Sequence, residues 1–145
     1  DRLTRVKPAL SKHALALYAK SGNAFALTAV NARAQKAGLC VGMALTDARA
    51  ILPAALMLEA DAAADAALLD LIGAWCERFS PVVVLDAPDG LFLDTSGGAH
   101  LFGGEAALLE DAIRRLEAQG LAARGASALS RRRRKTARRV VGVRR

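Results

Sequence analysis

The sequence predicts an α/β fold, and the order of the elements expected after residue 61 is the main reason. Apolar residues at helical spacing predict a helix over residues 62–79, with one face made by Leu68, Ile72, Trp75, Cys76 and Phe79. Two short apolar runs then flank a turn, and a second helix over 105–119 leads to a further strand. The order helix, strand, strand, helix, strand is that of a split βαβ, ferredoxin-like domain without its first strand. We therefore expect an incomplete antiparallel sheet whose central place, beside the hairpin, is empty.

The residues before this domain predict a small lobe rich in alanine. Residues 24–30 predict a strand, and residues 32–37 a short helix that Gly38 closes. A second short helix is expected over 47–52, where Pro53 ends it, and a strand over 56–59. We expect a mainly helical lobe over residues 1–55, the sheet domain over 56–126 and a basic tail over 127–145.

Acidic residues gather around the expected hairpin. Its first strand is the apolar run Val82–Leu85, its turn contains Pro88 and an Asp-Gly pair, and its second strand is Leu91–Thr95. Three acids lie on or beside it: Asp86, Asp89 and Asp94. Paired carboxylates of this kind can hold divalent cations. Asp-Gly turns with flanking acids also occur in proteins that bind nothing, so the pattern alone leaves both interpretations open.

Composition and charge exclude several classes of protein. Hydrophobic residues make up 53% of the chain and aromatic residues 4%, so the core must consist mainly of Ala, Leu and Val. No apolar run reaches the roughly 18 residues of a membrane span, and we expect a soluble, cytoplasmic protein. Cys40 and Cys76 lack a metal-binding or redox pattern and are expected to be buried thiols. His13 and His100 have no partner pattern either, and we expect structural roles for both.

The hairpin region resembles the Y-family (UmuC/DinB-like) DNA polymerases. Phe79-Ser80-Pro81 matches the Tyr-Ser-Pro of that family, and Pro88–Asp94 follows at the spacing of its catalytic motif. The segments Asp94–Gly97 and His100–Glu105 are most similar to the ImuB branch. The resemblance puts Asp89 on the catalytic Asp of the family palm domain, and Gly90 on its catalytic Glu. Glycine supplies no ligand, so one of the two metal-site acids is absent.

A second resemblance lies in Leu27–Met43, which is similar to the fingers motif of the same family. Aligning Gly38 and Gly42 puts Ala32 and Gln35 where active members carry a Tyr and an Arg that hold the incoming triphosphate. Arginine matters there because its planar fork binds phosphate oxygens in pairs, which a neutral Gln cannot do. Arg33 and Lys36 are basic but do not match the motif. The resemblance covers about residues 21–120, and the first palm strand of the family, with its Asp, has no counterpart before Leu3.

The resemblance implies a non-catalytic, polymerase-like protein of DNA repair that acts in damage-induced translesion synthesis. Its implied partners are DNA, a sliding clamp, an accessory ImuA-like protein and a replicative-type error-prone polymerase, in the bacterial cytoplasm near the nucleoid. No cofactor is expected, apart from Mg²⁺ if polymerase activity remains. An active error-prone polymerase is the alternative, and Gly90, Ala32 and Gln35 argue against it.

The carboxy-terminal tail supports a third hypothesis, a small basic nucleic-acid-binding protein. Nine of the 21 basic residues lie between positions 131 and 145, which leaves 12 basic against 14 acidic residues before them, a balance of −2. The run Arg131, Arg132, Arg133, Arg134 and Lys135 could neutralise several phosphates. The similarity to the family stops near Ser127, and GC-rich DNA read out of frame encodes Arg-rich peptide. We therefore favour a reading-frame shift near Ser127 over a functional basic arm, and expect no ordered element in the tail.

Overall fold

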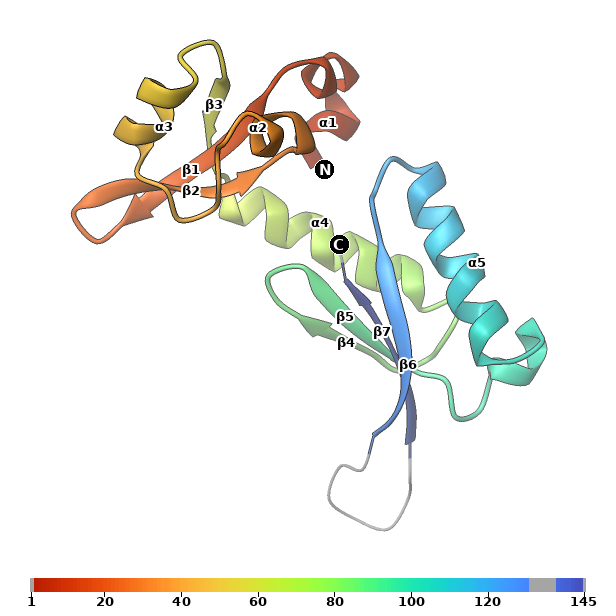
Figure 1. Ribbon diagram of the computed structural model, residues 1–145. Helices are drawn as coiled ribbons and strands as arrows, with labels where there is room; N and C mark the ends of the chain where they lie inside the picture. Colours follow the sequence, from red (N-terminus) through yellow and green to blue (C-terminus); the bar gives the residue numbers. More distant parts are fainter. Residues whose placement is uncertain (1, 131–137, 145) are drawn as a thin grey trace. The chain divides into compact units, whose positions relative to one another are not determined.

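The computed structural model of this 145-residue chain describes residues 2–130 and 138–144 (Figure 1). Contacts divide these residues into two compact units. The amino-terminal unit is Leu3–Ala62, and the carboxy-terminal unit begins at Ala63 and also includes Arg2. Arg2 belongs to the second unit because its Nε donates a 2.9 Å hydrogen bond to the carboxylate of Asp65.

The amino-terminal unit is built around a three-stranded sheet in the order β2-β1-β3. Its elements are α1 (Arg2–Val6), η1 (Pro8–Lys12), β1 (Leu15–Ser21), β2 (Ala24–Val30), α2 (Ala32–Lys36), α3 (Leu45–Ile51) and β3 (Leu56–Glu59). Strand β1 pairs antiparallel with β2 and parallel with β3. The core of this unit consists of buried small and aliphatic residues from the sheet, α2, α3 and the connection between them: Ala16, Leu27, Ala34, Leu39, Leu45 and Ala48.

Strand β1 is the main difference from the sequence prediction in this unit. The strands expected over 24–30 and 56–59 are confirmed, but no strand was predicted over Leu15–Ser21. Because β3 pairs with β1, residues 56–59 belong to the amino-terminal unit, and the expected boundary after residue 55 falls inside it. The lobe is therefore a mixed α/β unit rather than a mainly helical one.

One asparagine ties β1, β2 and α2 together. The Asn31 Oδ1 accepts hydrogen bonds from the backbone N–H of Leu15 at 3.1 Å and of Ala34 at 2.9 Å. Its Nδ2 donates to the carbonyl of His13 at 2.8 Å, and its backbone N–H donates to the carbonyl of Leu15 at 2.9 Å. Asn31 thus caps the first turn of α2 and fixes the start of β1 with a single side chain.

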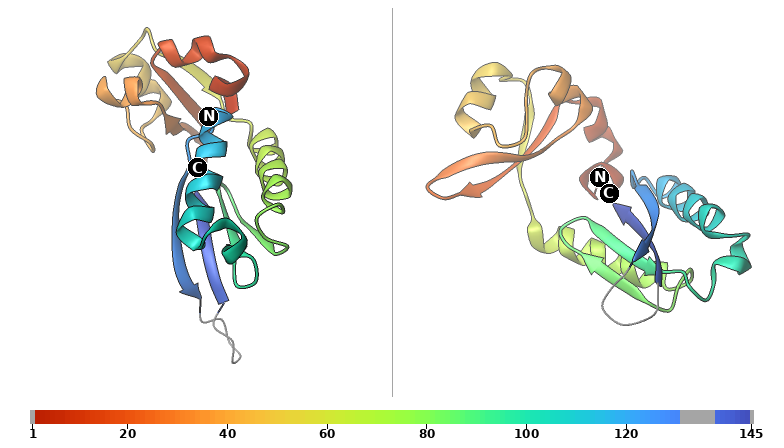
Figure 2. Two further views of the ribbon diagram at one scale, coloured as in Figure 1. Left: turned by 90° about the vertical axis from the view of Figure 1, so that its right-hand side faces the viewer. Right: turned by 60° about the horizontal axis from the view of Figure 1, so that its bottom comes forward.

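The carboxy-terminal unit is a four-stranded antiparallel sheet in the order β4-β5-β7-β6, with two helices packed on it. Its elements are α4 (Ala62–Cys76), β4 (Val83–Asp86), β5 (Gly90–Asp94), η2 (Ala99–Phe102), α5 (Glu105–Ala118), β6 (Arg124–Ser130) and β7 (Arg138–Arg144). The labels of Figure 1 show the order of the strands, and the right-hand view of Figure 2 shows the same sheet from another side. The α/β fold class predicted from the sequence is confirmed.

Helices α4 and α5 cover the same face of this sheet. Their buried side chains meet Leu91 and Leu93 of β5 in one core, whose other members are Leu68, Cys76, Phe79, Leu108, Ala112, Leu116 and Leu121. The approach is closest at Gly73 of α4, where an added Cβ would lie 2.7 Å from a methyl carbon of Leu85. Because side chains alternate along a strand, Val84, Asp86, Gly90 and Phe92 lie on the opposite, open face.

The centre of the sheet is filled, contrary to the prediction of an incomplete sheet. Strand β7 lies between β5 and β6 and pairs antiparallel with both (Figure 1). It comes from the segment 127–145, in which the sequence analysis expects no ordered element. Valine and glycine in the stretch 140–143 can form a strand, and pairing with two neighbours satisfies its backbone groups despite the flanking arginines.

The helices of both units end close to the expected positions. Helix α4 ends at Cys76 rather than Phe79, and α5 ends at Ala118, before Gly120 with its φ of 78°. No helix in the described part of the chain combines the length and the apolar character that crossing a bilayer requires.

We predict that Asn31→Ala destabilises the amino-terminal unit by about 1–2 kcal/mol, because it removes a helix cap and leaves backbone groups unsatisfied. Hydrogen exchange of the amides in β1, β2 and α2, measured by mass spectrometry, would show faster exchange. Asn23→Ala, at an exposed asparagine of the β1–β2 turn, is the matched control. Equal exchange in the Asn31 variant and the wild-type protein would contradict the role we assign to Asn31.

Candidate functional site: the acidic hairpin

The acids of the β4–β5 hairpin lie at both of its ends. Asp86 is the last residue of β4, and its register partner is Gly90 at the start of β5. Asp89 lies in the turn between them. Asp94 ends β5, four residues beyond Gly90, which at about 3.3 Å per residue separates them by about 13 Å along the strand. The hairpin thus brings Asp86 and Asp89 together at the turn but keeps Asp94 away from them.

Asp94 is part of the hydrogen-bond network at the open end of the hairpin. Its Oδ1 accepts from the backbone N–H of Ser96 at 3.1 Å, and its own N–H donates to the carbonyl of Val82 at 3.0 Å. The hydroxyl of Ser80, which is only 2% exposed, lies 2.7 Å from the Asp94 carbonyl and 3.0 Å from the Val82 carbonyl. The same hydroxyl oxygen accepts from the Val82 N–H at 3.1 Å. Ser80 therefore joins the start of β4 to the end of β5.

The residues around Asp89 are apolar, and none of them could bind a metal ion together with it. It lines a small pocket of about 20 Å³ with residues of α4, β5, α5 and the loop before β6: Leu69, Ile72, Leu91, Leu116, Leu121, Ala122 and Ala123. In the described part of the chain, no three His, Cys, Asp or Glu side chains come together in a way that could hold a metal ion. What the hairpin offers at its turn is two half-buried carboxylates, that of Asp86 opposite Gly90 and that of Asp89 just before it.

The fingers-like positions lie in the amino-terminal unit, on α2. Ala32 is the first residue of this helix and Gln35 lies one turn later, and both are exposed, whereas Ala34 between them is buried. Arg33 and Lys36 are also exposed on α2. Helix α2 therefore presents two cations and one amide to solvent, without a tyrosine or an arginine at the two motif positions.

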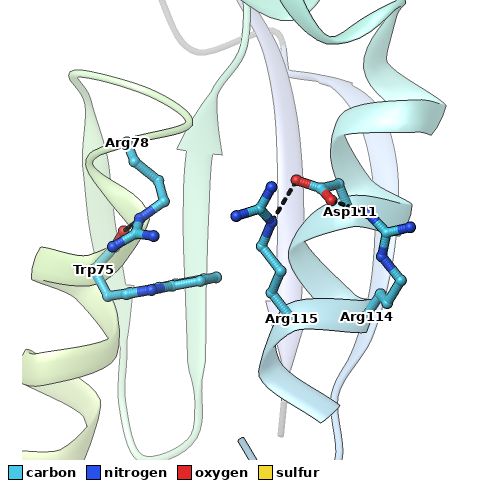
Figure 3. Close-up of polar contacts among 5 residues, drawn as sticks. All are labelled: Trp75, Arg78, Asp111, Arg114 and Arg115. Carbon is cyan, nitrogen blue, oxygen red and sulfur yellow. Dashed lines mark hydrogen bonds and ion pairs between the residues drawn. The ribbon is translucent and has the colours of Figure 1, made fainter. Parts of the chain in front are cut away.

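Arginines of the carboxy-terminal unit already have partners on the helices (Figure 3). The Arg78 guanidinium lies 4.5 Å from the centre of the Trp75 ring. On α5, Asp111 forms ion pairs with Arg114 and with Arg115, the latter at 2.8 Å. Partial burial acts to raise the pKa of Asp111, but the hydrogen bonds and charges of both arginines outweigh it and lower the pKa below its ordinary value.

The two cysteines differ from each other, and one contradicts the prediction that both are buried. Cys76 is fully buried in the core under the sheet, and burial raises its pKa to about 11, against a smaller lowering effect of Arg78. Cys40 is an exposed free thiol. The prediction was wrong for Cys40 because its neighbour Leu39 takes the core position.

The backbone register brings together residues of the sheet that no motif in the sequence connects. The register places Arg144 of β7 opposite Gly90 on one side and opposite Arg124 of β6 on the other. The signal in the sequence is weak: Arg124 stands apart from the basic run, and nothing local predicts its pairing. The predicted basic run Arg131–Lys135 lies outside the described residues.

The two units have the fold of the fingers and palm of a Y-family DNA polymerase. Residues 2–136 match the impB/mucB/samB family, and the chain belongs to this family. Among solved structures, it is similar to the insertion ternary complex of Dbh DNA polymerase, with a TM-score of 0.70 and 19% identity over 83% of this chain and 37% of that one. DinB from Sulfolobus solfataricus gives a TM-score of 0.66 and 19% identity over 81% and 34% of the two chains.

The curated relatives narrow the resemblance to one branch of the family. Protein ImuB of Caulobacter vibrioides, in strains NA1000 / CB15N and ATCC 19089 / CIP 103742 / CB 15, is 48% identical over 91 residues. The match covers 63% of this chain and 20% of each relative, so the chain spans about a fifth of the length of these proteins. The resemblance to the ImuB branch, inferred from the Asp94–Gly97 and His100–Glu105 segments, is confirmed.

We predict that Ser80→Ala destabilises the carboxy-terminal unit by about 1–3 kcal/mol, because it removes a buried hydroxyl and its three hydrogen bonds to the backbone of Val82 and Asp94. Urea unfolding followed by the fluorescence of Trp75, which lies in this unit, would measure the change. Ser127→Ala, at an exposed position of β6, should leave the midpoint within experimental error. A Ser80 variant as stable as this control would exclude Ser80 as the link between the two strands.

We predict that only Cys40 reacts with a disulfide reagent in mildly alkaline buffer when the protein is folded. Exposure permits attack on Cys40, whereas burial and the raised pKa keep Cys76 protonated and inaccessible. Thiol titration should give one equivalent for the native protein and two in concentrated guanidinium chloride. Native Cys40→Ser should give none, and rapid labelling of Cys76 in that variant would refute the assignment.

Proposed function

We propose that this chain is a non-catalytic, polymerase-like module that acts in the repair of damaged DNA. The observation that carries the proposal is Gly90, which stands at the family position of a metal-binding Glu and has no side-chain ligand. Membership of the impB/mucB/samB family and 48% identity to Protein ImuB support a role of this class.

The geometry of the hairpin also disfavours a two-metal centre for nucleotidyl transfer. Such a centre needs carboxylates that converge on two cations roughly 3.5–4 Å apart. Asp94 lies at the far end of β5 and is held by backbone contacts, so it is a poor replacement for the absent ligand. Strand β7, beside β5, contains no Asp or Glu in its sequence RRVVGVR. The residues present therefore do not fit a pair of Mg²⁺ ions, and we assign no catalytic step to them.

The fingers-like positions support the same proposal. A triphosphate needs cationic or hydrogen-bonding groups that match its oxygens, and arginine does this with a rigid pair of donors. Ala32 offers no such group, and Gln35 offers a neutral amide. A module of this kind keeps the shape of a polymerase without the contacts that select and activate a nucleotide.

In the cell, this module works in damage-induced translesion synthesis, in the bacterial cytoplasm at the nucleoid. Its partners under this proposal are DNA, the sliding clamp, an ImuA-like accessory protein and an error-prone polymerase that carries out the synthesis. Membership of the impB/mucB/samB family and the similarity to solved DNA polymerases support DNA as a partner, and the protein partners follow from the resemblance to the ImuB branch alone. No residue of this chain is assigned to the contacts with the protein partners.

We predict that the chain adds no nucleotide to a primed template, with Mg²⁺ or with Mn²⁺. The reason is the loss of one carboxylate at Gly90 and of both triphosphate contacts at Ala32 and Gln35. The measurement is single-nucleotide insertion on a labelled primer, resolved on a denaturing gel, with a Y-family polymerase as the positive control. Asp89→Ala is the matched variant, and it should behave as the wild-type chain does. Metal-dependent insertion that Asp89→Ala abolishes would establish the alternative, an active error-prone polymerase.

A further inference from the structure

Strand β4 is one edge of the four-stranded sheet. The order β4-β5-β7-β6 gives it a single neighbour, β5, and no strand lies on its other side in the part of the chain that the structure describes (Figure 1). An open strand edge offers backbone N–H and C=O groups to another extended chain, and many proteins protect such edges with lysine or proline. The stretch Val82–Asp94 contains no Lys or Arg, and the one charged residue of β4, Asp86, lies at its end. The middle of this edge is therefore uncharged.

The hairpin register determines which residues of β4 direct their backbone groups outward. The N–H of Asp94 donates a 3.0 Å hydrogen bond to the carbonyl of Val82. Along an antiparallel strand, residues that bond to the neighbouring strand alternate with residues whose N–H and C=O point away from it. Val82 and Val84 therefore direct their backbone groups to β5, whereas Val83 and Leu85 direct theirs outward. Among the described residues, no backbone hydrogen bond from another element reaches Val83 or Leu85, so β4 presents two N–H and two C=O groups at the edge.

Both faces of β4 carry exposed apolar side chains. Val84, which is 52% exposed, lies on the open face of the sheet beside its register partner Phe92, which is also exposed. Leu85, which is 40% exposed, lies on the face that α4 covers, against Gly73. At the other edge of the sheet, the described side chains of β6, at positions 124–127, are Arg, Gly, Ala and Ser. The β4 edge therefore suits a strand with apolar side chains on both of its faces, which β4 itself is.

The sequence of β4 is complementary to a second copy of the same strand. Antiparallel pairing about a two-fold axis at Val84 places Val83 of one copy opposite Leu85 of the other. The outward N–H and C=O groups of both strands then form hydrogen bonds with one another. Val84 faces Val84 of the second copy, with about 4.5 Å between the Cα atoms, and β-branched side chains pack well on such a pleated surface.

Charge and proline favour this register over the neighbouring ones. With the axis at Val84, Asp86 lies opposite Val82 of the second copy, and the two copies of Asp86 are four residues apart, about 13 Å along the edge. An axis at Asp86 would place the two carboxylates directly opposite each other, which destabilises a sheet. Pro81 has no N–H and ends the edge on the other side.

We propose that β4 pairs with β4 of a second copy of this chain, so that the two four-stranded sheets continue as one antiparallel sheet across an axis at Val84. The pairing involves only a few residues of each copy and is far smaller than the roughly 1,200 Å² of a stable interface, so we expect association at concentrations on the order of 0.1 mM. This inference goes beyond the proposed function, because it depends on neither DNA binding nor catalysis. The result of the insertion assay leaves it unaffected.

The test is hydrogen exchange of single amides in the full chain, measured by NMR at protein concentrations from about 0.01 to about 1 mM. Val83 and Leu85 should exchange about fivefold more slowly at the highest concentration, because about four fifths of the chain is then dimeric. Val84, whose N–H bonds to β5, should be protected throughout and is the internal control. Slow exchange of Val83 and Leu85 at every concentration would mean that another segment of the same chain covers the edge, and fast exchange at every concentration would mean that the edge stays open. Either result would overturn the proposal.

A cysteine at position 84 tests the position of the axis. Val84→Cys in a Cys40→Ser background should form a disulfide-linked dimer under mild oxidation, because a Cα separation of about 4.5 Å lies within the range of a disulfide. Phe92→Cys in the same background is the matched control, since Phe92 is exposed on the same face but lies one strand further from the axis. Its two copies would be three strand spacings, about 14 Å, apart, so cross-linking should be at least about tenfold slower. Equal rates for the two variants would contradict an axis at Val84.

Lysine at the edge should abolish the association. Val84→Lys places two ammonium groups directly opposite each other on the axis, and sedimentation equilibrium should give the mass of a monomer up to about 1 mM. Leu71→Lys, at an exposed leucine of α4, makes the same change away from the edge and should associate as the wild-type chain does. Association lost in Leu71→Lys but kept in Val84→Lys would assign the contact to α4 and refute the pairing, as would a wild-type chain that remains monomeric. Circular dichroism of each variant identifies any loss of fold.

Discussion

The carboxy-terminal unit depends on the backbone pairing of β7 with both β5 and β6. The hairpin of β4 and β5 is a two-stranded ribbon that by itself is marginal in water, and β6 has no neighbour in the sheet other than β7. β7 supplies partners along the whole of β5 and β6, from Gly90 to Asp94 and from Arg124 to Ser130. Unpaired buried backbone groups would otherwise oppose the packing of α4 and α5 on this sheet. The core that these helices form with Leu91 and Leu93 therefore requires a segment that is distant in the sequence.

This pairing also determines the chemistry at the centre of the sheet. Among the polymerases that the chain resembles, the strand beside the acidic hairpin brings an Asp. Here the neighbouring strand is β7, whose sequence RRVVGVR contains no Asp or Glu. The acids of the hairpin therefore have no carboxylate beside them on that strand, and the fold is kept without this part of a metal centre.

Local signals in the sequence predict most of the elements but not their long-range pairing. Strand β2 and strand β3 were predicted with their observed bounds, because a Ser-Gly-Asn turn precedes the first and Pro53 precedes the second. A helix over 105–119 was predicted from its apolar spacing and the glycine that follows, and α5 is observed over Glu105–Ala118. Strand β1 was missed because residues 15–19 are a short continuous apolar run, which periodicity alone cannot assign to a strand or a helix. Strand β7 was missed because an arginine-rich segment is typical of a solvated tail, and only its pairing with strands far away in the sequence makes it part of the sheet.

The roles of the acids in the candidate site also could not be predicted from the sequence, because they depend on the strand register. Sequence alone treats Asp86, Asp89 and Asp94 as equivalent acids, and only the register separates them: two lie at the turn and one lies at the open end. Asp94 and Ser80 serve the hairpin itself, through hydrogen bonds that fix its two strands. Gly90, Ala32 and Gln35 differ from the polymerase pattern, and none of them contributes a side chain to either hydrophobic core. The residues that stabilise the fold are thus different from those at the metal-binding and nucleotide-binding positions. The latter can therefore be substituted while the fold is kept.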